Sequence, residues 1–302
     1  MHTHPGAFVA EGWKDYALLD AGYGQKWERW GSVTVVRPDP QIIWPPHLPH
    51  WEEAHMHYHR SSKGGGQWEH KKKTPGQWRI AFDGMSFIIR PTDFKHMGLF
   101  PEQAANWRWV KTCLQRHTGG ASNAPQVLNL FGYTGAATVA CLAAGAHVTH
   151  VDAAKGMNQW AKENIQANGF TENFRVLTDD VYKFVQREIR RGRKYDGIIM
   201  DPPSYGRGPG GEVWKLEDKL YELLQSCRQI LSAQPLFFLL NAYTAGFTPV
   251  AAENVLAAIF DSPETGQQKN TGVNISAGAL GIPIGNTGRI LPCGMSARVT
   301  FA

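Results

Sequence analysis

The chain has 302 residues, of which 42% are hydrophobic and 19% charged, and its formal net charge is +5. That length accommodates one large domain or two smaller ones, and since no apolar run is long enough to span a bilayer we predict no membrane partner. The four cysteines lie far apart without a Cys-x-x-Cys pair. This excludes a disulfide framework or cysteine zinc site and predicts a cytoplasmic protein, while the basic charge is compatible with a polyanionic partner.

The chain up to about residue 98 has the pattern of short strands interrupted by proline and glycine. Three segments carry it: SVTVVRP (32–38), QIIWPP (41–46) and PGQWRIAFDGMSFIIRP (75–91). The last of them predicts a hairpin that turns at Asp83 and Gly84. The glycine- and lysine-rich segment 61–76 is predicted to be a loop. We therefore predict a smaller β-rich domain over residues 1–98.

Strands and helices alternate in the rest of the chain. Pro101 is expected in the first turn of a helix. Strand patterns cover 126–131, 147–152, 174–179, 196–201 and 236–243, and helix patterns begin at Gly135 and cover 156–169, 181–192 and 216–231. This alternation predicts an α/β domain over residues 99–302, with a doubly wound parallel sheet and antiparallel edge strands near the C-terminus.

The turn after the first strand of that domain has the sequence Phe131-Gly132-Tyr133-Thr134-Gly135. Gly132 would let the backbone approach a ligand, and Gly135 would permit close helix–strand packing. Asp152 ends the second strand at 152 − 132 = 20 positions further on, the interval at which a carboxylate meets the ribose of an adenosine cofactor. S-adenosylmethionine has no phosphate and suits this loop better than a dinucleotide does. The alternative is that the glycines only shape a turn.

Two further strand ends carry acidic residues. Asp179 and Asp180 close the third strand, where a carboxylate could accept a hydrogen bond from an adenine amino group. Asp180 could equally cap the helix that begins near Val181. Asp201 closes the fourth strand, at the position that would face the reactive end of the cofactor.

The segment that follows Asp201 is DPPSYGR, in which Pro202 and Pro203 cannot continue a sheet. A rigid turn there could present backbone carbonyls and the Asp201 carboxylate to the N–H groups of a nucleobase. Tyr205 could stack on a base that has been turned out of an RNA helix. The simpler interpretation is a proline turn with a surface tyrosine.

These motifs resemble a known family. Residues 127–169, 178–184 (TDDVYKF) and 195–208 (YDGIIMDPPSYGRG) are similar to class I S-adenosylmethionine-dependent RNA methyltransferases, in particular the bacterial 23S ribosomal RNA large-subunit methyltransferases of the I and K/L type. The likeness spans about residues 94 to 245. It implies a Rossmann-like methyltransferase sheet, S-adenosylmethionine as the cofactor, ribosomal RNA as the partner, and a role in rRNA processing.

The motifs and the resemblance together define the expected site. The expected cofactor-binding residues are Phe131, Gly132, Tyr133, Thr134, Gly135, Asp152, Ala153, Asp179, Asp180, Asp201 and Gln103, the last of which could instead cap a helix. The expected catalytic residues are Asp201, Pro202, Pro203 and Tyr205, and the expected substrate-binding residues are Ser204, Tyr205 and Arg207.

One departure from the family bears on the chemistry. Methylation at carbon 5 of a pyrimidine needs a cysteine nucleophile, which relatives supply after the fifth strand. Residues 239–246 (LLNAYTAG) contain no cysteine, and Cys227 lies in the middle of a predicted helix, where a buried apolar thiol is common. We therefore predict nitrogen methylation without a covalent intermediate, with guanine favoured by the resemblance. The alternatives are methylation of a protein side chain or small molecule, and a non-catalytic RNA-binding protein.

Two conspicuous N-terminal features are predicted to be structural. His55, His57 and His59 have no cysteine or acidic partner at zinc-site spacing, so we predict a polar edge or loop and no metal site. The lysine run 71–73 is predicted to be a solvated loop, although lysines there could also contact phosphates.

Overall fold

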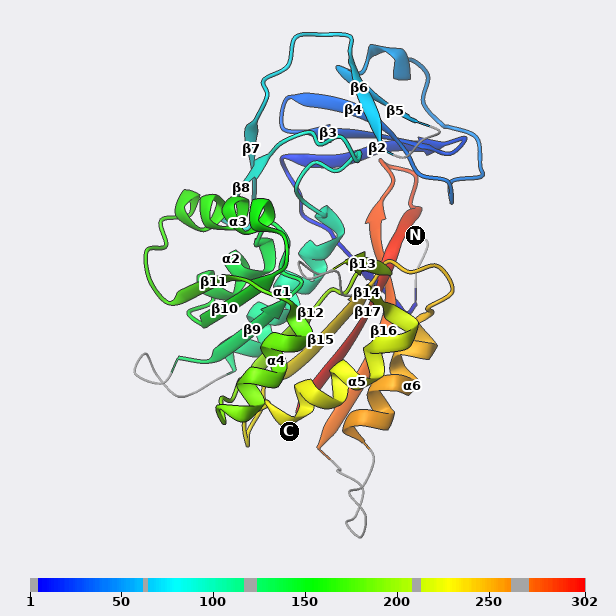
Figure 1. Cartoon of the computed structure of the whole chain (residues 1–302). Coiled ribbons are helices and arrows are strands. Elements are labelled where there is room, and N and C mark those ends of the chain that lie inside the picture. The colour runs from blue at the N-terminus through cyan, green and yellow to red at the C-terminus, as the bar shows by residue number, and fades with distance from the viewer. Residues whose placement is uncertain (1–4, 62–64, 117–123, 208–212, 262–271, 302) are drawn as a thin grey trace. The chain divides into compact units, whose positions relative to one another are not determined.

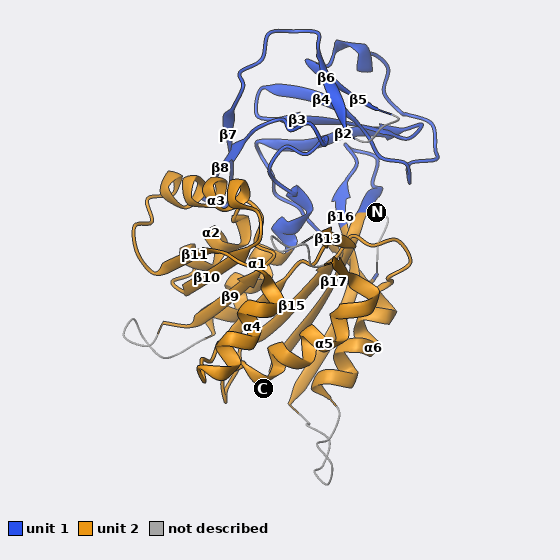
Figure 2. Ribbon diagram, viewed as in Figure 1, with its two compact units in different colours: residues 1–5, 9–105, 281–292 blue, residues 6–8, 106–280, 293–302 orange. Residues whose placement is uncertain are grey.

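A computed structural model describes residues 5–61, 65–116, 124–207, 213–261 and 272–301. Figure 1 shows the order of its elements. Figure 2 shows its two compact units. Unit 1 comprises residues 1–5, 9–105 and 281–292, and unit 2 comprises residues 6–8, 106–280 and 293–302.

An eight-stranded sheet dominates unit 2, in the order β1-β16-β17-β15-β12-β9-β10-β11. Its strands are β1 (Ala7–Val9), β9 (Gln126–Leu130), β10 (His147–Asp152), β11 (Phe174–Thr178), β12 (Gly197–Met200), β15 (Phe237–Ala242), β16 (Val273–Pro283) and β17 (Ile290–Phe301). Five neighbouring strands of this sheet are parallel: β15, β12, β9, β10 and β11. Strand β17 runs antiparallel to β15. The predicted doubly wound sheet is confirmed. The C-terminal strand β17 is antiparallel as predicted, but it is not an edge strand, because it lies between β15 and β16.

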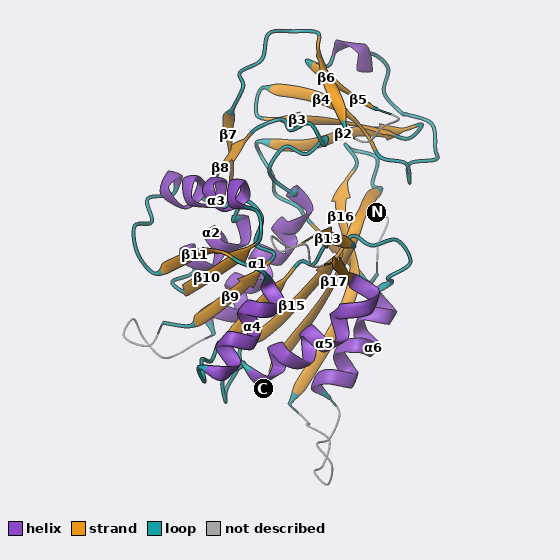
Figure 3. Ribbon diagram, viewed as in Figure 1, coloured by secondary structure: helices purple, strands orange, loops and turns teal. Residues whose placement is uncertain are grey.

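Helices cover both faces of this sheet, as Figure 3 shows. They are α1 (Ala104–Gln115), α2 (Ala136–Ala143), α3 (Lys155–Ala167), α4 (Val181–Arg190), α5 (Leu216–Gln229) and α6 (Pro249–Phe260). Helices α4, α5 and α6 pack on one face, and α1, α2 and α3 pack on the other. Of the helices in the described ranges, none is long and apolar enough to cross a membrane.

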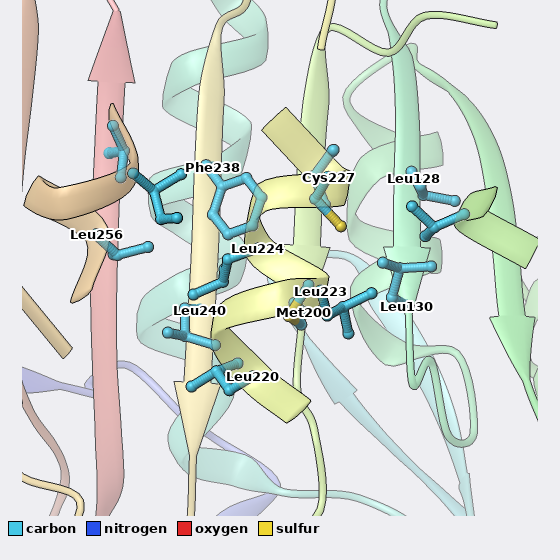
Figure 4. Close-up of a cluster of buried hydrophobic side chains, with 14 of the residues drawn as sticks. Leu128, Leu130, Met200, Leu220, Leu223, Leu224, Cys227, Phe238, Leu240 and Leu256 are labelled. Atoms are coloured by element: carbon cyan, nitrogen blue, oxygen red, sulfur yellow. The ribbon is translucent and has the colours of Figure 1, made fainter. Parts of the chain in front are cut away.

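The main core of unit 2 lies between the sheet and helices α4, α5 and α6. Figure 4 shows the side chains that form its centre: Leu128, Leu130, Met200, Leu220, Leu223, Leu224, Cys227, Phe238, Leu240 and Leu256. Alternate strand positions such as 128 and 130 point to this face, because side chains alternate along a strand. Each large apolar side chain buried here stabilises the fold by about 1.5–3 kcal/mol. Cys227 is fully buried among them, as expected.

Unit 1 is built mainly from a five-stranded sheet in the order β2-β3-β4-β5-β6. Its elements are β2 (Tyr16–Gly22), β3 (Gln25–Trp30), β4 (Val33–Pro38), β5 (Met56–Arg60), β6 (Gly66–His70), the hairpin β7 (Trp78–Phe82) and β8 (Met85–Ile89), and the 3-10 turns η1 (Trp51–Glu53) and η2 (Pro101–Gln103). The predicted hairpin with its turn at Asp83 and Gly84 is confirmed. Pro101 opens η2, just before α1, rather than the α-helix itself.

Two local predictions in unit 1 are wrong. Residues 41–46 do not form a strand, because their backbone bonds to a turn: the carbonyls of Ile42 and Trp44 accept N–H groups from Gly24 and Tyr23. Conversely, residues 66–70 of the predicted loop form β6 and pair antiparallel with β5. The close pairing at Gly66 leaves no room for a side chain, since an added Cβ would lie 2.6 Å from the hydroxyl oxygen of Tyr58.

The structure also contains elements that were not predicted in unit 2. A short hairpin joins β13 (Tyr205–Arg207) to β14 (Val213–Lys215) directly after the proline turn. Helix α6 is a further addition, although its N-terminus has recognisable signals. Thr248 caps it by accepting the N–H of Ala251, and Pro249 occupies its first turn.

Candidate functional site

The candidate site lies where the strand order of the large sheet reverses. Strand β9 lies between β10 and β12, and the chain continues from β9 to β10 on one side and reaches β12 on the other. In open parallel sheets a ligand binds beyond the carboxyl ends of the strands at such a point. The carboxyl ends of β9, β10, β11 and β12 lead into residues 131–135, 152–154, 179–180 and 201–205, with Asp152 as the last residue of β10, so the fold brings these segments to one edge of the sheet.

The loop after β9 has an unusual backbone. Phe131 and Tyr133 have φ angles of 56° and 51°, in the left-handed region that bulky residues rarely adopt. Each such conformation costs on the order of 1–3 kcal/mol and persists only where the surroundings impose it. Strain of this kind is often found at binding sites, and here it occurs at the carboxyl end of the first strand.

The two glycines of this loop serve packing. A Cβ added at Gly132 would lie 2.5 Å from Nδ1 of His150, so the ring of His150 requires glycine there. Gly135 has a φ of 82°, and a Cβ there would lie 2.8 Å from Cβ of Ala161 on α3. The close contact that Gly135 permits is therefore with a helix, and not with a strand as predicted.

A buried polar chain lies beneath the loop. Asn129 donates to Thr138 Oγ1 (2.9 Å), and Thr138 Oγ1 lies 2.9 Å from Nδ1 of His150. Burial lowers the pKa of His150 to about 4, so its ring is neutral at pH 7. Because the Thr138 hydroxyl can donate to Nδ1, the ring proton can lie on Nε2, and a hydrogen bond with the side chain of Asn158 acts to raise the pKa of the ring. This chain was not predicted from the sequence, in which Asn129, Thr138 and His150 fall in three different elements.

Asp152 joins two of the loops. Its carboxylate oxygens accept the N–H groups of Tyr133 (2.9 Å) and Ala154 (2.8 Å). Burial raises the pKa of Asp152, while the N–H groups of Ala154 and Tyr133 act in the opposite direction. A carboxylate has about four acceptor positions, so these two bonds leave acceptor capacity for a pair of ribose hydroxyls. The residues present therefore fit an adenosine cofactor.

The acids after β11 have protein partners. Asp180 caps α4 by accepting the N–H of Lys183 (2.9 Å), which realises one of its two predicted roles. Asp179 forms an ion pair with Arg187. Nearby, Thr134 is buried and its carbonyl accepts from Asn164 (2.8 Å), and Ala153 is half-buried.

The proline turn is a structured loop that several contacts hold in place. Asp201 donates its backbone N–H to the Leu130 carbonyl (3.4 Å), which connects the turn to the end of β9. The Pro203 carbonyl accepts from the indole N–H of Trp214 (2.6 Å), and the hydroxyl of Ser204 lies 2.7 Å from that of Thr244. Pro202 is buried, and its neighbour Pro203 is exposed.

Trp214 also links this turn to the loop after β9, because its ring lies 5.3 Å from the ring of Phe131. Beyond the turn, Tyr205 opens β13 and is 51% exposed. Trp214 was not predicted to belong to the site, because it follows a glycine-rich stretch without a strand pattern. The exposure of Tyr205 is compatible with both interpretations of this residue, base stacking and a surface tyrosine, and the hairpin around it was not predicted.

Two predicted site residues, Gln103 and Arg207, are not among the contacts of the site described above. Gln103 belongs to unit 1, where it lies in η2 and donates its backbone N–H to the Phe100 carbonyl (3.0 Å). Its approach to the cofactor therefore stays a prediction. Arg207 ends β13 and pairs with Val213, and its side chain lies outside the described part of the structure.

Comparison with known proteins identifies relatives of the whole chain and of its central part. The crystal structure of a SAM-dependent methyltransferase from Agrobacterium tumefaciens superimposes with a TM-score of 0.90 and 37% identity, covering 98% of this chain and 93% of that one. The ribosomal RNA large subunit methyltransferase K of Neisseria meningitidis is 25% identical over 63% of this chain and 52% of its own length. The K/L enzyme of Allochromatium vinosum is 29% identical over 51% of this chain and 20% of its own. The chain thus spans about half, or less, of these curated relatives.

A family model matches more than half of the chain. The model for S-adenosylmethionine-dependent methyltransferases matches residues 54–252, which include every segment of the candidate site that unit 2 contributes. The cofactor of this family, S-adenosylmethionine, has two ribose hydroxyls, which the remaining acceptor positions of the Asp152 carboxylate could bind. The chain is an enzyme that belongs to the S-adenosylmethionine-dependent methyltransferase family.

Proposed function

We propose that this enzyme transfers a methyl group from S-adenosylmethionine to a base nitrogen of ribosomal RNA in the cytoplasm, with guanine as the favoured base. The observation that carries the proposal is the turn 201–205 at the edge of the sheet where the cofactor loops converge. Trp214 and Thr244 hold this turn, and it ends in the exposed ring of Tyr205. A rigid acceptor platform beside a stacking ring suits a planar base with N–H donors.

Three segments of unit 2, residues 131–135, 152–154 and 179–180, would hold the cofactor, which supplies an electrophilic methyl group when it is bound. Asp152 would accept the ribose hydroxyls, with its carboxylate oriented by the N–H groups of Tyr133 and Ala154. The backbone of residues 131–135 and the side chain of Phe131 would line the same pocket. Asp180 already accepts one backbone N–H and could accept an adenine amino group with its remaining lone pairs.

The substrate side would rest on Asp201, Pro202 and Tyr205. The Pro203 carbonyl already accepts from Trp214, so the Asp201 carboxylate and the Pro202 carbonyl are the better acceptors for the N–H groups of a base. Hydrogen bonds to these acceptors would orient the nitrogen lone pair toward the methyl group, and Tyr205 would cover one face of the ring. Catalysis then depends mainly on position, while the proton that the nitrogen loses when it is methylated would pass to the Asp201 carboxylate or to water.

The states of the cysteines support transfer without a covalent intermediate. Cys113, Cys141 and Cys227 are buried, and burial raises the pKa of each, for Cys113 to about 11. A thiolate nucleophile is unfavourable at such positions. Cys293 in β17 is half-buried, and it is the residue that a test of the covalent route has to address.

RNA is proposed as the substrate because the curated relatives are named as ribosomal RNA methyltransferases and because the chain is basic, with a net charge of +5. The β-rich residues 1–98 would help hold the RNA, and residues 99–302 would carry out the transfer. Phosphate contacts make RNA binding strongly dependent on salt, whereas a neutral small substrate would show little dependence.

The test incubates the protein with labelled S-adenosylmethionine and ribosomal RNA from cells that lack it, and identifies the labelled nucleoside by mass spectrometry. We expect an N-methylated base, with guanine first. Asp201→Ala should keep cofactor affinity and lose transfer, and Cys293→Ala should keep the rate of transfer. A carbon-5 methylpyrimidine, or loss of transfer in Cys293→Ala, would contradict the nitrogen mechanism. No label in RNA, with normal cofactor binding, would favour a protein or small-molecule substrate.

A further inference from the structure

Unit 1 displays an aromatic ring on a fixed loop. Residues 92–96 form a turn that the bond from the N–H of Thr92 to the carbonyl of His96 closes (2.9 Å). Phe94 lies at its tip and is 68% exposed. Its neighbours in sequence, Asp93 and Lys95, are charged, so the ring is not part of a continuous apolar surface. An exposed phenylalanine on such a loop adds little to the core of the unit.

Three side chains from the five-stranded sheet donate hydrogen bonds to backbone carbonyls of this loop. Tyr58 donates to the Asp93 carbonyl (2.5 Å), and Trp68 donates to the Thr92 carbonyl (2.9 Å). Arg37 donates to the Lys95 carbonyl (2.9 Å). Each bond links the loop to a different strand, β5, β6 or β4. The backbone that carries Phe94 is therefore fixed before any ligand arrives, which reduces the entropy lost on binding.

Cations gather around the same loop. Lys95 has a left-handed backbone, with φ of 65°, and its ammonium donates to the Pro38 carbonyl (3.2 Å). Burial lowers the pKa of Lys95, and the nearby charges of Lys26, Arg37 and Arg60 lower it further, while Asp39 acts in the opposite direction. These cations repel one another at the base of the Phe94 turn. An anion bound there would relieve the repulsion.

The nearby carboxylates offset this charge only in part. Glu28 pairs with Arg37 (2.6 Å), and Asp39 pairs with Lys26 (3.5 Å). Lys95 and Arg60 form no ion pair among the described residues, and the loop 92–96 itself carries a single carboxylate, the exposed Asp93. The combination of an exposed ring with excess positive charge is the pattern by which proteins bind single-stranded nucleic acids.

We propose that the Phe94 loop binds an unpaired nucleotide of the RNA substrate. The base would stack on the ring of Phe94, and the adjoining phosphate would contact Lys95 and Arg60. This inference rests on the proposed RNA substrate, and it adds a contact in unit 1 that is separate from the acceptor groups of the proline turn. A protein partner fits less well, because charged residues flank the ring on both sides.

The test measures binding of an unstructured RNA oligonucleotide that contains 2-aminopurine, whose fluorescence stacking quenches. We expect Phe94→Ala to weaken binding at least about fivefold and to abolish the quenching, while Phe94→Trp retains both. Tyr221→Ala is the matched control, because it removes a 49% exposed ring from α5, where Glu217, Asp218 and Glu222 place negative charge. This control should bind RNA as the wild type does.

A second variant tests the phosphate contact. Arg60→Met keeps the aliphatic stem and should reduce the slope of log affinity against log salt by about 0.7, the value for one phosphate contact to a single strand. Wild-type affinity and quenching in Phe94→Ala would overturn the proposal even if the enzyme methylates RNA. Conversely, absence of methyl transfer to RNA, with binding still dependent on Phe94, would reject the proposed function and leave the loop as a nucleotide site.

Discussion

At the scale of single residues, Asp152 has the most clearly defined surroundings in the site. Both of its carboxylate oxygens accept backbone N–H groups, from two loops that the proposed cofactor would contact. We predict that Asp152→Asn weakens S-adenosylmethionine binding about 10- to 100-fold, because a hydrogen bond to a charged group contributes about 1.5–3 kcal/mol. Titration calorimetry with the cofactor measures this directly.

Asp196 offers a matched control for that variant. It also accepts a backbone N–H, from Gln126 (2.8 Å), but it precedes β12 and so lies at the opposite edge of the sheet. Asp196→Asn should lower the free energy of unfolding by about as much as Asp152→Asn does, but it should keep cofactor affinity. Equal losses of affinity in both variants would show that Asp152 acts only through the fold.

Several single residues of the site could be predicted, and others could not. Asp152 and Asp201 were identified because strand ends and residue spacing are visible in the sequence. His150 was not predicted because its role depends on contacts with Thr138 (150 − 138 = 12 positions away) and Gly132 (150 − 132 = 18 positions away). Such contacts follow from the pairing of β9 with β10 and from the position of α2, which spacing alone does not specify.

At the scale of elements, the β13–β14 hairpin makes the proline turn part of a larger structure. Trp214 on β14 bonds to the Pro203 carbonyl and packs on Phe131. We predict that Trp214→Phe keeps the packing, loses the hydrogen bond, and lowers kcat about two- to tenfold with cofactor affinity unchanged. Steady-state kinetics with saturating cofactor measures the effect.

A comparison is needed to separate this loss from general damage by a tryptophan substitution. Trp109 on α1 packs on Phe237, away from the turn, with ring centroids 5.7 Å apart. Trp109→Phe should leave kcat close to that of the wild type. If Trp214→Phe retains full kcat, the hairpin does not control the position of the substrate turn.

Helix α4 allows the two predicted roles of Asp180 to be separated. Asp180→Ala removes the cap on Lys183 N–H and should lower the free energy of unfolding by about 1 kcal/mol. Asp180→Ser should preserve the cap and most of the stability. Urea unfolding and cofactor titration of both variants decide the matter: normal affinity in Asp180→Ser would show a cap alone, and weaker affinity at normal stability would show an additional adenine contact.

The elements that the sequence predicted correctly are those whose pattern is long and local. The strand at 126–130 is recognisable from a short apolar run, and the helix at 181–190 from apolar residues at helical spacing, so neither prediction depends on knowing the tertiary contacts. Residues 41–46 were misassigned because their β-branched pattern is overridden by hydrogen bonds to the β2–β3 turn. Residues 66–70 pair as a strand despite Gly66 because β5 supplies the partner.

At the scale of the whole molecule, the buried His150 makes stability depend on pH. Its pKa of about 4 in the folded chain lies below the ordinary value of 6.5, because the ring is buried. Between these values the unfolded chain binds the proton and the folded chain does not. We therefore predict that the free energy of unfolding is at its full value above about pH 6.5 and falls as the pH drops toward 4, by roughly 2–3 kcal/mol in total.

Urea unfolding of the wild type at pH 7 and pH 5 measures this loss. His150→Asn places an amide near the position of Nδ1 and should reduce the difference between the two pH values, even if the variant is less stable at both. The exposed His70 provides the control, since His70→Asn should leave the pH dependence unchanged. An unchanged pH dependence in His150→Asn would assign the effect to other groups.

The position of β17 has a consequence for how the enzyme is made in the cell. Residues 290–301 follow all the other strands of the large sheet along the chain, yet β17 lies inside that sheet, between β15 and β16. A nascent chain that does not yet include these residues leaves the edge of β15 unpaired, and β16 cannot join the sheet. Activity should therefore appear only once translation has passed β17, and products of premature termination upstream of it should be inactive and prone to aggregate.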